Sequence, residues 1–288
     1  MMNNICYLNG KLLSQAEARV SAADGGLLYA DGLFETIRLY GSRPYLLEQH
    51  LQRLKAGAKY LEIPLDSLEE LSAAVEQVIE ANSVSEGSLR ITLTGGGNRS
   101  ALWPRPAQEK PTLLITVKKT VPYPEHTYQK GYRAVLVSFP RNESSPLVKL
   151  KSLDFTEYML GKREALQNNC DEGIFLNTRG ELTEGATSNL FIFDGKALQT
   201  PAIDCGLLPG ITRAETLRLA RDKLGVPVVE KVLYCKDLEQ AEEAFLTASI
   251  LEIMPLVEVN GQKIGAGGPG SLSRSILELY RKQIASSR

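Results

Sequence analysis

Short apolar runs that end in glycine turns alternate with amphipathic helical patterns along this chain, and this mixture most constrains its fold. Asn9-Gly10 separates the apolar runs 5–8 and 11–13, which predicts a hairpin with a type I′ turn, because both central residues take positive φ. Gly41-Ser42 and Asn260-Gly261 separate further strand pairs. Because hairpins join antiparallel strands, we expect mixed rather than purely parallel sheets, in an α/β protein.

Helices are predicted between these strands. Apolar residues recur at spacings of three and four from Leu47 to Leu61, the period of one helix face, so a helix is expected over residues 48–60. Ser67 followed by Glu70 is a capping box that opens a second helix, and Thr212 followed by Glu215 gives the same signal later.

A proline-rich break divides the chain. Val121-Pro122-Tyr123-Pro124 neither continues a strand nor suits a helix start, because proline lacks the amide hydrogen and restricts the residue before it. We therefore expect a small N-terminal α/β domain over residues 1–120, a linker over 121–131 and a large C-terminal domain over 132–288.

Composition excludes several classes of function. The formal net charge of the 288 residues is −1 and no block of Lys and Arg occurs, which argues against nucleic-acid binding. With no leader pattern and no apolar run long enough for a bilayer, we expect a cytoplasmic protein without membrane association. Four scattered cysteines and two histidines form no metal motif, so we expect no metal and a chemistry supplied by an organic cofactor.

A lysine and a glutamate suit pyridoxal 5′-phosphate as that cofactor. Lys151 precedes a helical pattern, and Glu184 adjoins the small, hydroxyl-rich stretch 185–189. The cofactor needs a primary amine to form an imine and an acid to keep its ring nitrogen protonated. Lys149 is a rival amine that would point the opposite way in an extended segment, and spacing alone does not choose between the two.

Candidate phosphate-binding groups occur further along the chain. Pro209-Gly210-Ile211-Thr212 offers a glycine for close backbone approach and amides at a helix start. Thr247-Ala248-Ser249 offers further hydroxyl and amide donors, and Arg53 could bring a planar fork to the anion. An ordinary N-cap at Thr212 and a solvated helix arginine at Arg53 are the alternative interpretations.

These motifs resemble the class IV (fold type IV) pyridoxal phosphate enzymes, namely branched-chain and D-amino acid aminotransferases and 4-amino-4-deoxychorismate lyase. Residues 47–54 look like the family's helix with the phosphate arginine, and residues 208–213 look like its phosphate turn, whose leucine packs on the cofactor ring. The similarity runs from about Tyr7 to Gly261 and selects Lys151 over Lys149. It implies a two-domain fold and the following cofactor contacts: Arg53, Lys151, Glu184, Leu208, Ile211, Thr212, Ala248 and Ser249.

The chain departs from the family pattern at two places. The lysine is commonly followed by an Asn-Tyr pair whose hydroxyl reaches the cofactor, whereas this chain has Asp154-Phe155. The common Thr-Arg-Gly strand end is Thr94-Gly95-Gly96, so an arginine is lost, and we expect the glycines to make room beside the substrate. Because Phe155 has no hydroxyl, either another group donates to the cofactor or the pKa of the imine differs.

The resemblance gives weaker predictions for the substrate side. Arg90 occupies the position of a substrate-pocket arginine in branched-chain aminotransferases. Arg99 lies near the carboxylate trap of D-amino acid aminotransferases, although the histidine that accompanies that trap is Ala101 here. The segment from Tyr29 through Phe34 to Arg38 lines the substrate side in the family, partly across a dimer interface.

Two reactions fit this machinery, and the resemblance implies a homodimer for both. We favour an aminotransferase that exchanges the amino group of a small branched-chain or D-amino acid with a 2-oxo acid. The alternative is 4-amino-4-deoxychorismate lyase, which releases pyruvate and 4-aminobenzoate, because residues 34–40 and Arg141-Asn142 look like such lyases. A non-catalytic homologue that only binds the cofactor is a third interpretation, against which the intact set Lys151, Glu184 and Ser249 argues.

Overall fold

The computed structural model describes residues 4–97 and 110–286. The chain divides into two compact units. The first comprises Met1–Pro122 with Leu150–Asp154, and the second comprises Tyr123–Lys149 with Phe155–Arg288. The expected limits of the linker, residues 121 and 131, stay predictions. Residues 150–154 belong to the first unit, although they lie within the range expected for the second domain.

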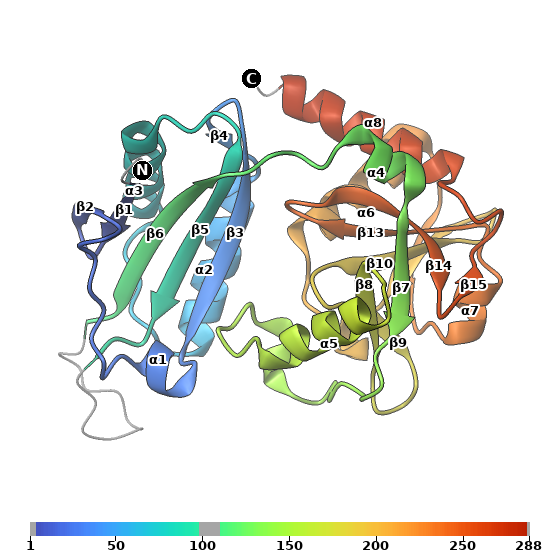
Figure 1. Ribbon diagram of the computed structural model, residues 1–288, viewed down its shortest axis with the longest axis horizontal. Helices are drawn as coiled ribbons and strands as arrows, with labels where there is room; N and C mark the ends of the chain where they lie inside the picture. Colours follow the sequence, from blue (N-terminus) through green and yellow to red (C-terminus); the bar gives the residue numbers. More distant parts are fainter. Residues whose placement is uncertain (1–3, 98–109, 287–288) are drawn as a thin grey trace. The chain divides into compact units, whose positions relative to one another are not determined.

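The first unit is built on an antiparallel sheet, whose strands run in colour from blue (β1) to green (β6) in Figure 1. Its strand order is β2-β1-β6-β5-β3-β4. Asn9 and Gly10 take φ of 48° and 88° between β1 and β2, so the predicted hairpin is confirmed. The strands in the described residues are β1 (Ile5–Leu8), β2 (Lys11–Ser14), β3 (Gly32–Tyr40), β4 (Arg43–Pro44), β5 (Gly87–Thr94) and β6 (Thr112–Lys119).

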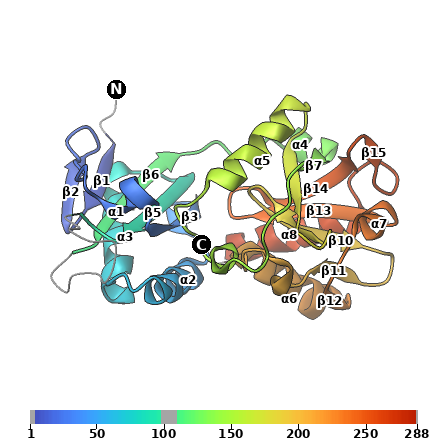
Figure 2. The same ribbon diagram turned by 90° about the horizontal axis from the view of Figure 1, so that it is seen from below.

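Two amphipathic helices, α2 (Leu47–Tyr60) and α3 (Leu68–Asn82), pack on one face of this sheet (Figures 1 and 2). Ser67 and Glu70 form the predicted capping box at the start of α3, which is confirmed. The apolar faces of α2 and α3 pack on the inner face of the sheet and form one core with it, because each of these elements buries only one side. Its most deeply buried members include Ile37, Leu39, Leu51, Leu54, Val75, Val78, Leu89, Ile91 and Ile115.

A separate piece of chain, Leu150–Asp154, covers part of the edge of β3. The amide of Phe34 donates to the carbonyl of Lys151 at 2.9 Å, and the amide of Leu153 donates to the carbonyl of Gly32 at 2.9 Å. β4 pairs only with the far end of β3, so residues 151–153 satisfy backbone groups that the sheet leaves open.

The short helix α1 (Gly25–Tyr29) is fixed to the ends of β5 and β6 by Asp24. The buried Asp24 carboxylate accepts from the amide of Gly26 at 2.8 Å and from the hydroxyls of Thr94 at 2.8 Å and Thr112 at 2.7 Å. These three donors offset the cost of burying a carboxylate, so the Asp24 side chain anchors the start of α1 to the sheet.

The glycines after β5 allow a close approach of backbone to backbone. Gly96 takes φ of 85°, and a Cβ there would collide with the carbonyl of Lys110. The amide of Gly25 donates to the carbonyl of Gly96 at 2.7 Å. The space at Gly96 is therefore filled by main chain, which differs from the expectation that it opens room for a substrate.

The second unit contains a mixed sheet whose strand order is β12-β11-β10-β13-β14-β7-β8-β9, with β15 paired to β14. β9 also pairs with β10 through Glu184 and Asn189, which closes six of the strands into a ring. The strands in the described residues are β7 (Tyr132–Leu136), β8 (Glu172–Leu176), β9 (Leu182–Gly185), β10 (Asn189–Phe193), β11 (Leu198–Pro201), β12 (Val228–Lys231), β13 (Glu243–Ala248), β14 (Glu252–Val259) and β15 (Gln262–Lys263).

Helices cover this second sheet. α5 (Thr156–Gln167) packs on β7 and β8, whereas α6 (Ile211–Leu224) and α8 (Ser271–Ser286) pack together and against β13. α4 (Glu125–Lys130) lies inside the expected linker and begins directly after Pro124, so the expectation that this segment does not start a helix is wrong. The remaining helical segments are η1 (Pro146–Lys149), η2 (Ile203–Cys205) and α7 (Cys235–Glu239).

The start of α6 differs from its prediction. The helix begins at Ile211 with Gly210 as the N-cap, two residues earlier than a cap at Thr212 requires. Among the described residues no side chain caps it, so the predicted capping box of Thr212 and Glu215 is wrong. No helix within the described ranges has the length and apolarity needed to cross a membrane.

Replacing Ser67 by alanine should lower the free energy of unfolding by about 1 kcal/mol, because the capping box loses one of its two hydrogen bonds. Urea unfolding monitored by circular dichroism measures this change. Asp66→Ala alters an exposed neighbour outside the capping box and should change the same quantity by less than about 0.5 kcal/mol. Equal effects of the two substitutions would contradict the assignment.

Candidate active site

Lys149 and Lys151, the two rival amines, occupy different surroundings. The Lys149 side chain is half-exposed and pairs with Asp204 at 2.7 Å, in the second unit. Lys151 is half-buried in the first unit, and its Nζ lies 4.7 Å from the centre of the Phe34 ring. Lys149 thus belongs to a surface ion pair, whereas Lys151 is half-buried. This difference in burial supports Lys151 as the reactive amine.

Phe34 carries two cations on its ring. The Arg90 guanidinium lies 3.9 Å from the ring centre, and the Lys151 amine approaches the same ring. Phe34 is on β3 and is nearly fully buried, and Arg90 is on the neighbouring strand β5, offset from it along the pairing. Attraction of a cation to an aromatic ring favours both contacts, so the amine and the guanidinium are each held at the Phe34 ring.

Arg53 is held by a buried carboxylate that the sequence did not point out. Its Nε donates to Glu35 Oε1 at 2.8 Å and its Nη2 to Glu35 Oε2 at 2.7 Å, a bidentate fork. His50 Nδ1 lies 2.7 Å from the same carboxylate. Because Glu35 comes from β3 while His50 and Arg53 lie one turn apart on α2, this cluster also joins the helix to the sheet.

Burial and the neighbouring charges together set the charge states of this cluster. Burial alone raises the pKa of Glu35, but the Arg53 guanidinium and the His50 hydrogen bond outweigh it and hold that pKa at about 2. Burial lowers the pKa of His50 below its usual range, with Arg53 and Lys151 acting in the same direction and Glu35 opposing. We therefore assign a neutral imidazole that donates to an ionised carboxylate, not an ion pair.

Glu184 is buried in β9, and in the described part of the second unit it receives hydrogen bonds from groups that include Arg141, Tyr158, Asn189 and the amide of Leu208. Arg141 Nη1 donates to its Oε1, and the Tyr158 hydroxyl lies 3.2 Å from the same oxygen. Asn189 Nδ2 donates to Oε2 at 3.0 Å and the amide of Leu208 donates to it at 3.2 Å. The predicted acid is thus a fixed, ionised carboxylate with an arginine beside it.

Phe155 stands where the family commonly has a tyrosine, and another tyrosine, Tyr158, lies one turn further along α5. The Phe155 ring stacks on Tyr158 with a centroid distance of 4.7 Å and an interplanar angle of 14°. The hydroxyl that is absent at Phe155 is therefore present on a neighbouring ring, but it is directed to Arg141 and Glu184. It does not occupy the position expected for the family's tyrosine.

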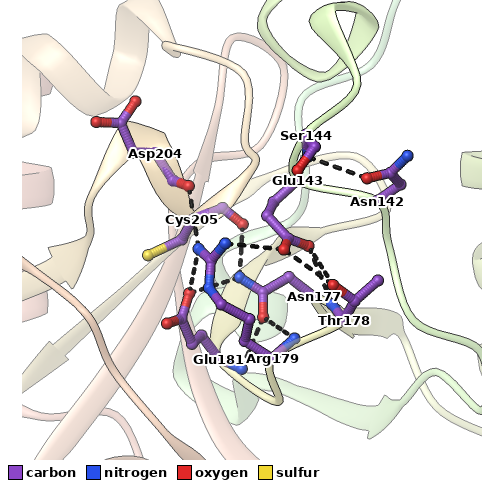
Figure 3. A network of polar contacts seen from close by, with 9 residues as sticks. All are labelled: Asn142, Glu143, Ser144, Asn177, Thr178, Arg179, Glu181, Asp204 and Cys205. Atoms are coloured by element: carbon purple, nitrogen blue, oxygen red, sulfur yellow. Dashed lines mark hydrogen bonds and ion pairs between the residues drawn. The ribbon is translucent and has the colours of Figure 1, made fainter.

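A polar network holds Glu143 against the residues around Arg179 (Figure 3). Glu143 accepts from the hydroxyl of Thr178 at 2.9 Å and from Arg179 Nη1 at 2.8 Å. The other end of that guanidinium donates to Glu181 Oε2 at 2.7 Å, and Asn177 donates to the same oxygen at 2.6 Å. These contacts tie residues 141–143 to the turn before β9, so they position both Arg141 and Glu184.

The same network reaches the turn that leads to α6 (Figure 3). Asn177 Nδ2 donates to the carbonyl of Cys205 at 3.1 Å, and Arg179 Nη2 donates to that of Asp204 at 3.4 Å. A Cβ at Gly206 would lie 2.7 Å from the Cα of Glu143, so the two segments touch through main chain. The stretch before Leu208 is thus fixed on both sides.

The start of α6 fits a phosphate group. In the described part of the chain no side chain caps the helix, so the amides of Ile211 and Thr212 remain oriented towards its N-terminal end. A Cβ at residue 210 would collide with the side-chain oxygen of Asn189, so glycine is required there. Asn189 also donates to the carbonyl of Leu208 at 3.0 Å, which connects this turn to Glu184.

The end of β13 adjoins this region. Thr247 pairs with Asn189 across β10 and β13, and its buried Oγ1 has no hydrogen-bond partner among the described residues. Ala248 and Ser249 follow it and are half-buried. An unsatisfied buried hydroxyl beside an uncapped helix start is a donor set that suits an anionic cofactor.

The remaining residues predicted for the substrate side have different surroundings. Arg38 is buried and pairs with Glu86 at 3.0 Å, which makes it structural. Tyr29 is exposed on α1. Arg99 lies outside the described residues. No group of three or more potential metal-ligating His, Cys, Asp or Glu side chains occurs within the residues that the structure covers.

Sequence reasoning missed several partners of the predicted residues. The spacing of His50 and Arg53 on one helix face was a usable signal, since residues three apart are neighbours. Glu35, Arg141 and Tyr158 gave no comparable local signal, because each meets its partner only through the tertiary fold.

The free energy of unfolding should fall by roughly 1–2 kcal/mol between pH 7 and pH 5 because of His50. Folded His50 stays neutral, whereas the unfolded side chain binds a proton below pH 6.5, so stability is present above that pH and is lost below it. Urea unfolding at several pH values should show a smaller slope for His50→Gln. His126→Gln removes an exposed histidine and should keep the full slope. An unchanged slope in His50→Gln would contradict the neutral assignment.

Known proteins with similar sequences cover almost the whole chain. The chain is 35% identical over 280 residues to a Methanocaldococcus jannaschii protein named as a candidate branched-chain-amino-acid aminotransferase, covering 96% of this chain and 94% of the relative. It is 31% identical over 280 residues to aminodeoxychorismate lyase from Bacillus subtilis, with the same coverage. D-alanine aminotransferase from Staphylococcus haemolyticus is 29% identical, covering 97% of this chain and 98% of the relative.

Solved structures agree with the described fold. The branched-chain amino acid aminotransferase of Escherichia coli superimposes with a TM-score of 0.92 and 29% identity, covering 97% of this chain and 94% of that one. The branched-chain aminotransferase of the archaeon Thermoproteus uzoniensis with norvaline gives a TM-score of 0.88 at 30% identity, covering 96% and 93%. The predicted mixed α/β, fold type IV architecture is confirmed.

The family described as amino-transferase class IV matches residues 32–259, most of the chain. Class IV aminotransferases depend on pyridoxal 5′-phosphate, so the cofactor prediction is confirmed, as is the prediction of an enzyme. The matched segment contains Phe34, Lys151 and Glu184, together with the start of α6. The chain belongs to the class IV aminotransferase family.

Proposed function

We propose that this protein is an aminotransferase that exchanges the amino group of a small branched-chain or D-amino acid with a 2-oxo acid. The observation that carries the proposal is the approach of Lys151 and Arg90 to one aromatic ring, that of Phe34. Such an arrangement provides a reactive amine and a carboxylate-binding guanidinium at one ring, and an α-amino acid requires both kinds of group. Full-length similarity to aminotransferases supports it.

Each reacting group has a defined task in this proposal. The bound cofactor supplies a ring that accepts electrons when a bond at the substrate Cα breaks. Lys151 Nζ would take the proton from the substrate Cα and deliver it to the C4′ carbon of the cofactor, and the second half-reaction would run this transfer in reverse; such general acid–base catalysis typically contributes about 10²–10⁴-fold to the rate. Glu184 holds the proton on the ring nitrogen, and the donors described above keep the carboxylate in place while it does so.

Phosphate binding is assigned to separate groups. The amides of Ile211 and Thr212 at the uncapped start of α6 and the Ser249 segment would hold the phosphate, with Leu208 against the ring. Arg53 would add a cation whose orientation is set in advance by Glu35. A pre-oriented arginine loses little entropy on binding, so this support strengthens anchoring.

Aminodeoxychorismate lyase is the second candidate. Its support is the 31% identity to the Bacillus subtilis lyase and the resemblance of residues 34–40 to such enzymes. The visible spectrum of the purified protein separates the two reactions. Bleaching of the cofactor band by D-alanine, L-leucine or L-glutamate and its recovery with a 2-oxo acid would establish transamination. A band that no amino donor bleaches, with pyruvate release from aminodeoxychorismate, would establish the lyase.

Lys151→Ala should abolish the visible band of the cofactor and reduce turnover by at least about 10²-fold, because both depend on this amine. Lys149→Ala removes the neighbouring lysine that pairs with Asp204 and should keep the band and most of the activity. Absorbance spectra and steady-state kinetics of both variants measure this. Full activity in Lys151→Ala, or equal losses in the two variants, would refute the assignment of the amine.

We further propose a homodimer. Leu27, Leu28 and Tyr29 expose large apolar surfaces together on α1, directly before and at the start of the segment 29–36 that lies partly across the dimer interface in the family. Leu27→Glu should therefore shift the mass measured by light scattering from two chains towards one. Leu12→Glu, on the exposed face of β2, serves as the control and should keep the larger mass. A wild-type mass of a single chain would contradict this proposal. The cytoplasmic location stays a prediction.

A further inference from the structure

We propose that Tyr158 is a positioning residue for Glu184, which lowers the basicity of that carboxylate and so adjusts how firmly the cofactor ring nitrogen keeps its proton. This inference rests on the proposed contact between Glu184 and the ring nitrogen. It concerns a residue of α5 that neither the motifs nor the similarity to known proteins assigned to the site.

Packing fixes the Tyr158 ring on two sides. Phe155 stacks on one face, with centroids 4.7 Å apart, and Phe175 meets the ring edge-on at 6.1 Å and 80°. Phe155 precedes the first residue of α5, and Phe175 lies on β8. Because both neighbours are apolar and rigid, the hydroxyl has one direction available, towards β9.

The hydroxyl joins the two charged groups of the buried pair. It lies 3.2 Å from Glu184 Oε1, and it accepts a hydrogen bond from Arg141 Nη2. Arg141 uses its other terminal nitrogen for Glu184. Because Arg141 donates to the phenol oxygen, the hydroxyl proton is directed to the carboxylate of Glu184.

The charge state of the Tyr158 phenol supports donation of its proton to Glu184. Burial, together with the charge of Glu184, raises the pKa of Tyr158 above its usual range, so the hydroxyl keeps its proton and remains a donor. Burial alone would lower the pKa of Arg141, but Glu184 outweighs it and keeps the guanidinium charged. A carboxylate that accepts from a phenol and a guanidinium is a weaker base than one that accepts from water.

The other groups that face Glu184 do not replace this hydroxyl. Asn189 and the Leu208 amide bind the second carboxylate oxygen, Oε2. Glu157, the remaining charged neighbour on α5, lies 3.4 Å from Arg141 Nε, so its charge acts on the guanidinium. Tyr158 and Arg141 are the groups described at Oε1, so a change in the Tyr158 hydroxyl acts on this oxygen.

The decisive variant is Tyr158→Phe, which keeps the stacked ring and removes one oxygen atom. Pyridoxamine 5′-phosphate labelled with ¹⁵N in its ring is the probe, because it forms no imine with Lys151 and its ¹⁵N chemical shift reports ring protonation directly. Tyr158→Phe should raise the pH at which the bound ring loses its proton by about 0.5–1 unit, a three- to tenfold change in proton affinity. Tyr60→Phe, an exposed tyrosine on α2, should match the wild type.

Glu184→Gln separates this inference from the proposed function. If it leaves the titration of the ring nitrogen unchanged, the contact between Glu184 and the ring is wrong and the inference fails with it. If Glu184→Gln alters the titration while Tyr158→Phe coincides with the wild type, Tyr158 has only a packing role and the inference alone is overturned. A raised midpoint in Tyr158→Phe supports it, because a packing role would not move the titration of a ligand atom.

Discussion

The buried ion pair between Arg141 and Glu184 is the interaction on which the arrangement of the second unit depends. Glu184 lies where β9 meets β10 and closes the ring of strands, and its partner across that closure, Asn189, also binds the carboxylate. Removing one member of a buried pair typically costs about 3–5 kcal/mol, because the other charge is left uncompensated. The acid proposed to act on the cofactor is therefore also part of what completes the sheet.

The first unit contains a similar buried cluster of a carboxylate and a guanidinium, but here the carboxylate orients the guanidinium. Glu35 is fully buried and serves to orient Arg53, whereas in the second unit Arg141 serves to orient Glu184. His50 completes the first cluster as a neutral donor, and Tyr158 completes the second. In each case a carboxylate and a guanidinium are fixed by a third, uncharged group, which satisfies donors and acceptors that burial would otherwise leave unpaired.

Local signals predicted the local features of this protein. The hairpin at Asn9-Gly10 and the capping box at Ser67 depend on a few adjacent residues, and both occur as expected. The start of α6 differs from its prediction, because glycine is required at position 210 by the side chain of Asn189 and not by its sequence neighbours. Arg141 lies 43 residues from Glu184, so no periodicity could pair them. Lys151 could be selected from its motif, but its membership of the first unit follows only from the strand edge it covers.

Because residues 150–154 belong to the first unit, that unit is discontinuous along the chain. Residues 150–154 complete the edge of β3, yet 27 residues assigned to the second unit, from Tyr123 to Lys149, separate them from Pro122. A fragment ending at Pro122 would keep the helices and the sheet core but would lose the lysine and expose the backbone groups of Gly32 and Phe34. Domain swaps and fusions that treat residue 122 as a modular boundary would thus separate the reactive amine from the strand that holds it.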